Sequence, residues 1–109
     1  MAFKSWSIYE FTGASVGSPV TTTLLSSSVD TSIIVISLVL SNYSTTEEAN
    51  ITVSRTDISN TVKFKWKITI PALNSPVSLD SKIAFINGDK LKITSDAVEV
   101  GVDASGDES

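Results

Sequence analysis

The sequence predicts an all-β protein, built as a single antiparallel β-sandwich or jelly-roll-like domain of about eight or nine short strands. Three observations support this prediction. Residues 62–70 (VKFKWKITI) alternate apolar and polar side chains without a break, and this is the period of the two faces of a strand. β-Branched residues dominate the most apolar stretch, 33–40, and they favour strands over helices. Turn-forming residues separate such stretches at the regular spacing of a sandwich.

The first half of the chain predicts three strands. Phe3–Phe11 forms the first, residues 13–19 form a loop, and the Thr-rich Val20–Ser26 forms the second. Thr31–Ser41 is the third, and its apolar side chains indicate a central strand that is at least partly covered on both faces. The polar residues 42–48 then form an exposed loop at one end of the sandwich.

The second half predicts a hairpin and four further strands. Ile51–Arg55 and residues 62–70 alternate in the same way and are joined by a short polar link, so they pair antiparallel. Pro71 ends the second of them because proline has no N–H to donate to the ladder. The other predicted strands are Val77–Leu79, Lys82–Ile86, Lys90–Thr94 and Ala97–Val102, with a tight turn at Asn87-Gly88-Asp89. The predicted sandwich thus spans residues 1–102, and residues 103–109 form an acidic C-terminal tail.

The alternation also predicts the core. Apolar side chains of 62–70 should pack against leucines and isoleucines of the other strands; the set is Val62, Phe64, Trp66, Ile68 and Ile70 with Leu38, Leu40, Leu79, Leu91 and Ile93. For Trp66 the alternative is an exposed platform for carbohydrate, and the alternation argues against it. Trp6 either packs within the first strand or anchors a protein interface near the chain end.

Missing residue types exclude most catalytic chemistry. The chain has no cysteine and no histidine, so it can form no disulfide, no Cys-His or Ser-His-Asp site and no typical zinc site. Asp103-Ala104-Ser105-Gly106-Asp107 offers too few ligands for a calcium loop. We therefore expect no enzymatic activity, no cofactor, no metal and no small-molecule substrate.

Charge and hydropathy exclude two kinds of partner. The net charge of −4 provides no basic footprint for nucleic acid. The apolar stretch 33–40 is shorter than the roughly 20 residues that a membrane-spanning helix needs. The first residues do not have the pattern of a secretory signal, so we expect synthesis in the cytoplasm. Ser and Thr supply 31 residues, and such hydroxyl-rich surfaces are less costly to desolvate in protein contacts than charged ones.

Two charged groups are candidate protein interfaces. Lys63, Lys65 and Lys67 share the outward face of one predicted strand. They either protect an edge strand from aberrant pairing or dock an acidic neighbour. The C-terminal end is acidic, with Asp103, Asp107 and Glu108, and copies of the chain could meet head to tail through the two groups; alternatively this end is a solvated tail.

Several short motifs follow one another in the second half: Ile70-Pro71-Ala72, Val77-Ser78-Leu79-Asp80, Lys82-Ile83-Ala84-Phe85 and Asn87-Gly88-Asp89-Lys90-Leu91-Lys92-Ile93. Together with Ile8-Tyr9 and Leu40-Ser41-Asn42, this order resembles small β-sandwich virion proteins of tailed bacteriophages. The resemblance implies a non-enzymatic structural protein in many symmetry-related copies. Capsid decoration or cementing is the preferred role, and a position at the neck, tail or a fibre is the alternative role. It further implies a location in the virion, homo-oligomeric or multi-copy assembly, and contacts with major capsid or neck and tail proteins.

A module that binds carbohydrate or a receptor is the second hypothesis. Sandwiches often present ligand loops at one end, and such a site would show exposed aromatic residues beside Asn or Asp. Tyr43 beside Asn42 is the candidate pair, with a purely structural role as its alternative.

Overall fold

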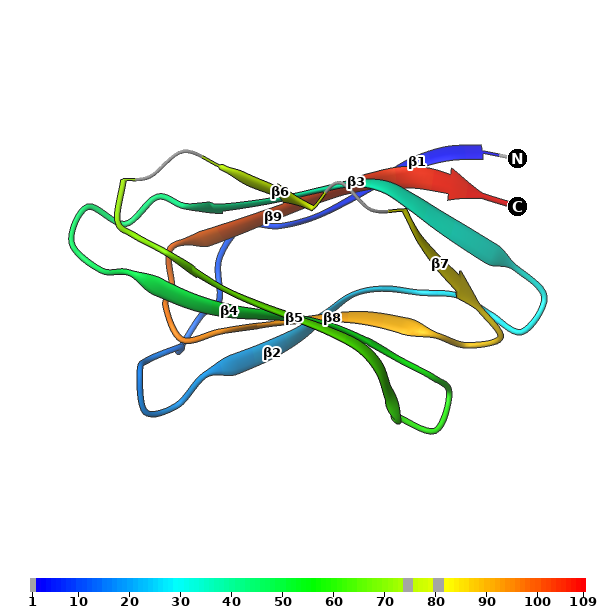
Figure 1. Ribbon diagram of the computed structural model, residues 1–109, viewed down its shortest axis with the longest axis horizontal. Helices are drawn as coiled ribbons and strands as arrows, with labels where there is room; N and C mark the ends of the chain where they lie inside the picture. The colour runs from blue at the N-terminus through cyan, green and yellow to red at the C-terminus, as the bar shows by residue number, and fades with distance from the viewer. Residues whose placement is uncertain (1, 74–75, 80–81) are drawn as a thin grey trace.

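Two antiparallel sheets lie face to face in the computed structural model, which describes residues 2–73, 76–79 and 82–109 (Figure 1). One sheet has the order β1-β9-β3-β6, with β7 also paired to β3, and the other has the order β2-β8-β4-β5. The strands found in these residues are β1 (Ala2–Ile8), β2 (Val20–Ser26), β3 (Ser32–Asn42), β4 (Ala49–Thr56), β5 (Val62–Ile70), β6 (Val77–Leu79), β7 (Ile83–Ile86), β8 (Lys90–Ser95) and β9 (Val100–Glu108). The predicted all-β sandwich and the β4–β5 hairpin are confirmed.

The core lies between the two sheets, where their inward-facing side chains meet. The largest fully buried side chains are Phe11, Phe85, Ile33, Leu38, Leu40, Ile51, Ile70, Leu91, Ile93, Val35, Val53 and Val100. Burying one such side chain contributes about 1.5–3 kcal/mol. Phe11 follows the end of β1 rather than lying within it, and its N–H donates to the Val98 carbonyl over 2.9 Å. The first strand therefore ends three residues before its predicted end, and it starts one residue before its predicted start.

A β-bulge in β3 decides which of its residues reach the core. The register with β9 shifts between Val35 and Ser37, so Ile36 is the extra residue. Before the bulge Ile33 and Val35 are buried, and after it Leu38 and Leu40 are buried. Uninterrupted alternation would have turned these two leucines outward.

The C-terminal residues differ most from the prediction. Residues 103–108, predicted as an acidic tail, continue β9, which lies between β1 and β3 in the middle of its sheet. Asp103 pairs with Ser7 and Val39 on either side, and Asp107 with Phe3 and Ile34. Two neighbouring strands thus supply the backbone hydrogen bonds that order a segment with weak strand propensity.

The predicted core is correct in the middle of the sandwich and wrong at one side. Val62 is 49% exposed, and Phe64, Trp66, Ile68 and Leu79 are only partly buried. The cause is the position of β5 and β6, each of which ends its sheet; among the described residues β5 pairs with β4 alone and β6 with β3 alone. An edge strand lacks the second neighbour that would cover its inward side chains.

The turn at Asn87-Gly88 has the predicted positive φ angles, 55° and 87°. It joins β7 and β8, which belong to different sheets, so it carries the chain across the sandwich. The part of the chain that the structure describes contains no helix long and apolar enough to cross a membrane.

Candidate interaction site

Strand β5 presents two different faces along its nine residues. Lys63, Lys65 and Lys67 point outward and are exposed. The residues between them point toward the other sheet, as the period of two requires. On the neighbouring strand β4, Lys65 lies opposite Ser54 and Lys67 lies opposite Thr52, so the sheet itself offers these two lysines no acidic partner.

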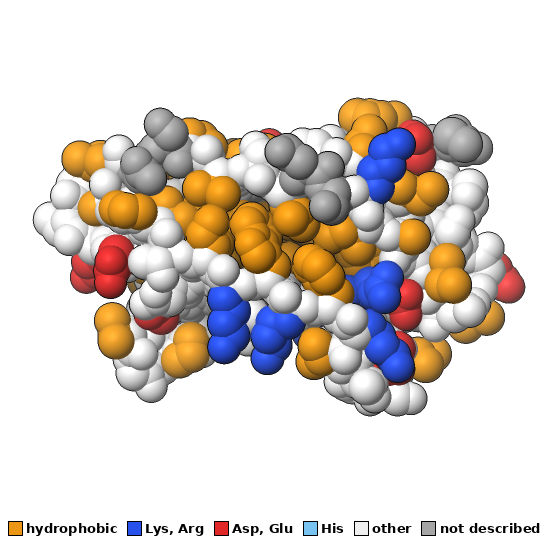
Figure 2. Space-filling model, in the orientation of Figure 1, with side chains coloured by type: hydrophobic (Ala, Val, Ile, Leu, Met, Phe, Trp, Pro, Cys, Tyr) orange, Lys and Arg blue, Asp and Glu red, His pale blue; other side chains and the backbone are white. Residues whose placement is uncertain are grey.

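Partly buried apolar side chains line the opening between the two sheets on the β5 side. We call this set the apolar seam; it consists of Phe64, Trp66 and Ile68 from β5 with Val77 and Leu79 from β6. Figure 2 shows hydrophobic side chains gathered across this face, with Lys and Arg side chains along their lower border. The seam is continuous with the core, because its members pack against the buried cluster.

Arg55 ties the two sheets together near the same side. It pairs in register with Phe64 of β5, and its Nη1 donates to the Ala84 carbonyl of β7 over 3.0 Å. Its Nε is buried and has no hydrogen-bond partner among the described residues. The sequence placed Arg55 in a strand but contained no sign of this contact, because the partner is a backbone atom of the other sheet.

The lysines differ in their local partners. Lys63 Nζ lies 3.8 Å from Asp57 Oδ2, at the turn before β5. Neither Lys65 nor Lys67 forms an ion pair within the described ranges. These two lysines are therefore available to charged groups from outside the molecule.

The structure does not bring the acidic residues together with the lysines. Asp103, Asp107 and Glu108 belong to β9 in the opposite sheet. Asp103 is exposed on the outer face of that sheet, and Glu108 Oε1 accepts from Lys4 Nζ over 2.6 Å. Trp6 is partly buried and packs against the core from β1, which favours packing over a role as an interface anchor.

A second exposed apolar surface lies on the outer face of the five-stranded sheet. Phe3 and Ile34 flank Asp107 in register on either side, and they are 70% and 45% exposed. Ile36, at the bulge, is also exposed. We call Phe3, Ile34 and Ile36 the outer patch. No sequence signal predicts the outer patch, because its outward residues can be named only once the bulge at Ile36 is known.

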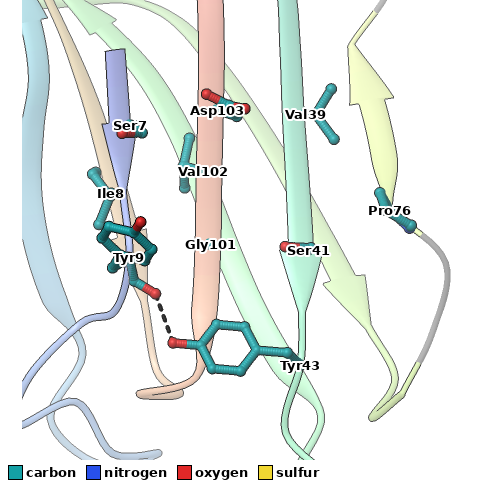
Figure 3. Close-up of a pocket in the computed structure, with 10 residues that line it drawn as sticks. All are labelled: Ser7, Ile8, Tyr9, Val39, Ser41, Tyr43, Pro76, Gly101, Val102 and Asp103. Carbon is teal, nitrogen blue, oxygen red and sulfur yellow. Dashed lines mark hydrogen bonds between the residues drawn. The ribbon is translucent and has the colours of Figure 1, made fainter.

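Two tyrosines border a shallow concavity of about 650 Å³ on the same outer face (Figure 3). The Tyr43 hydroxyl donates to the Tyr9 carbonyl over 2.6 Å. A Cβ added at Gly101 would lie 4.0 Å from Tyr43 Cε1, so the ring lies close beside this glycine. Partial burial, and then the carboxylates of Glu10 and Glu99, raise the pKa of Tyr43 above its ordinary value of 10.0.

Asn42, the predicted partner of Tyr43 in a ligand site, is committed to the fold. It is buried, and its Nδ2 donates to the carbonyls of Glu47 and Ile70 over 2.7 and 3.0 Å. Its Oδ1 accepts from the Ser44 N–H. These contacts favour the structural role of Asn42 that the sequence left open.

Comparisons with known proteins identify no family for this chain. No family model matches the chain, and no curated protein matches it. Solved structures of infectious bursal disease virus are similar in shape. The Gx strain gives 16% identity and a TM-score of 0.47 over 97% of this chain and 33% of that one. The Gt strain gives 12% identity and a TM-score of 0.38 over 99% and 30%. This chain spans about a third of those chains, and these scores are too low for the likenesses to carry an argument.

Proposed function

We propose that this chain is a non-enzymatic structural component of a bacteriophage virion that decorates or cements the capsid by bridging neighbouring subunits. One observation supports the proposal above the others: the domain exposes two separate apolar surfaces, each of which a neighbouring protein could cover. The apolar seam with its lysines lies at the β5 side, and the outer patch lies on the opposite sheet. A bridging protein needs two such surfaces, since it must contact two neighbours at once.

The composition of the surface agrees with this role. Exposed Ser and Thr lose less hydration energy than charged groups when a broad interface forms. Exposed apolar side chains such as Phe3 and Ile34 gain from burial in the same contact. The sandwich itself supplies a rigid body, so little conformational entropy is lost on assembly.

Quantitative mass spectrometry of purified particles tests the proposal. A copy number comparable to that of the major capsid protein supports decoration or cementing. A copy number far below it supports a ring at the neck or tail. Absence from the particles overturns both positions.

Addition of purified protein to particles that lack it tests the bridging surfaces. Ile34→Glu puts a charge into the outer patch. It should weaken the affinity for the particle at least tenfold, which is a loss of about 1.4 kcal/mol in binding free energy, and so lower occupancy at subsaturating concentrations. The matched control is Thr23→Glu, because Thr23 is exposed on a strand of the other sheet. Equal occupancy of the two variants would exclude the outer patch as a contact.

A carbohydrate- or receptor-binding module is the second candidate, supported by the tyrosines beside the concavity. Tyr9 is 88% exposed and Tyr43 is 45% exposed, so both rings could stack on a sugar. A glycan array on the isolated protein tests this, with Tyr9→Ala and Tyr43→Ala as variants. Binding that is lost in both variants would favour this function over bridging, and no binding by the wild type would remove it.

A further inference from the structure

Strand β5 is the edge strand of its sheet, and a further strand could extend the sheet there. From Lys63 to Ile68, exposed lysines alternate with the apolar side chains of the seam, and the ladder with β4 is regular from Phe64 onward. Among the described residues it pairs with β4 alone, so the backbone groups of its other edge have no strand to bond. Such an edge is a template for one more strand.

An added strand would extend both rows of β5 side chains. In an antiparallel ladder, residues directly opposite each other point to the same face. Positions opposite Phe64, Trp66 and Ile68 would enter the opening between the sheets and cover the apolar seam, which favours apolar residues there. Positions opposite Lys63, Lys65 and Lys67 would lie on the outer face.

The charge of the β5 lysines determines which residues an added strand would carry on that outer face. Lys65 and Lys67 have no ion-pair partner within the described ranges, and their neighbours on β4 are Ser54 and Thr52. An acidic side chain directly opposite each lysine would form a cross-strand ion pair, whereas a basic one would repel it. The complementary strand thus alternates acidic and apolar residues.

A second copy of β5 does not meet this requirement. Antiparallel pairing of two β5 edges in one register places lysines opposite lysines. In the other register it places lysines opposite Phe64, Trp66 or Ile68, on the apolar face. Both arrangements are unfavourable, so the occupant comes from a different chain.

We propose that β5 binds an extended segment of another protein by strand addition, and that this segment alternates acidic and apolar residues. The main chain supplies the hydrogen bonds, and the lysines and the apolar seam select the sequence. The inference rests on the proposed function only in that the segment would belong to a neighbouring virion protein. The strand-addition step itself can be tested on the isolated domain.

The test uses a soluble peptide as long as β5, 9 residues, that alternates Glu and Val, and a control peptide that alternates Lys and Val. Titration calorimetry measures affinity, and amide hydrogen exchange by NMR locates the bound strand. We expect the Glu peptide to bind at least tenfold more tightly than the Lys peptide and to slow exchange along β5. Lys65→Glu should weaken its binding by about tenfold.

Lys92→Glu is the matched control variant. Lys92 lies on the outer face of the same sheet, opposite Ser54, but β8 is paired on both sides and has no free edge. Its charge reversal should change affinity for the Glu peptide far less than Lys65→Glu does.

Three results would overturn the inference. The first is equal binding of the two peptides, and the second is protection of amides on β1 or β2 rather than β5. The third is absence of binding, which would leave the lysines with only a protective role at the edge. If the chain is nevertheless found in particles at capsid-like copy number, strand addition fails while the proposed function stands.

Discussion

Gly106 of β9 lies against the backbone carbonyl of Ile34 in β3. A Cβ built at Gly106 would overlap the Ile34 oxygen and approach the Ile34 carbonyl carbon and Val35 Cα to 2.9 Å. The bulge at Ile36 is adjacent in the same pair of strands, where the register shifts. The close approach of the two backbones therefore requires glycine at this position.

Gly106→Ala should destabilise the domain by at least about 3 kcal/mol, because backbone atoms, unlike a flexible side chain, cannot move aside without breaking the ladder. Urea denaturation followed by circular dichroism measures the change. Gly17→Ala is the control, since nothing lies within 4 Å of a Cβ there and its φ is not positive. Similar losses in both variants would contradict the proposed contact.

Asn42→Ala should cost about 3 kcal/mol. The change removes three hydrogen bonds and leaves the Glu47 and Ile70 carbonyls and the Ser44 N–H without this partner. Asn50→Ala provides the comparison, because Asn50 is exposed and water can replace its side-chain contacts with Asp96 and Thr69. Equal free energies of unfolding for the two variants would show that Asn42 does not hold its loop.

Local pattern was enough to predict most strands. The alternation of β5 gave its bounds, its outward lysines and its pairing with β4, because one period of two fixes both faces. Asn87-Gly88 was predicted as a turn because few residues accept positive φ. These features depend on neighbours in the sequence, so the sequence contains them.

Features that depend on distant strands were not predicted. Asp103 to Glu108 has the composition of a solvated tail, and it forms a strand because β1 and β3 flank it. Four residues of the apolar seam are predicted as core from the sequence, namely Phe64, Trp66, Ile68 and Leu79. The lysines of β5 allow an edge position as one alternative, but the alternation alone does not reveal that β5 ends its sheet. The outer patch depends in the same way on the bulge at Ile36. The order of strands in a sheet is a tertiary property, and it determines where the apolar seam and the outer patch lie.

Asp57→Asn should remove part of the pH dependence of stability. Asp57 Oδ1 accepts the N–H groups of Thr61 and Ser59, each over 2.9 Å. The Thr61 hydrogen bond, then that of Ser59 and the charge of Lys63, lower the pKa of Asp57 from 3.8. A lowered folded pKa stabilises the protein above the ordinary value, and this contribution is lost as the pH falls through the folded pKa.

The free energies of unfolding of the wild type and Asp57→Asn, measured at about pH 7 and about pH 2, give the comparison. Asparagine keeps an oxygen that accepts the same two N–H groups, so the variant should fold with the same turn. We expect the wild type to lose more stability than the variant on acidification. A difference that does not change with pH would show that the Asp57 charge contributes nothing to the turn.

Tyr43→Phe should destabilise the domain by at most about 1 kcal/mol at neutral pH, because it removes the hydrogen bond to the Tyr9 carbonyl from a half-exposed ring. The pKa of Tyr43 is raised above 10.0, so the neutral phenol donates at all lower pH values. The contribution of this hydrogen bond to stability is complete below the pKa that Tyr43 has in the unfolded chain. It is lost as the pH rises through the higher pKa of Tyr43 in the folded protein, because the phenolate has no proton to donate.

Urea denaturation of the wild type and Tyr43→Phe from neutral to alkaline pH measures this loss, and the gap between their stabilities should close only above the ordinary pKa. Tyr9→Phe is the matched control, since it removes a hydroxyl from the more exposed ring and leaves the Tyr9 carbonyl as acceptor. At neutral pH, Tyr9→Phe should have the same free energy of unfolding as the wild type. A loss in Tyr9→Phe as large as in Tyr43→Phe would mean that hydroxyls on this face act through solvation, and that the Tyr43 hydrogen bond does not fix the ring beside Gly101.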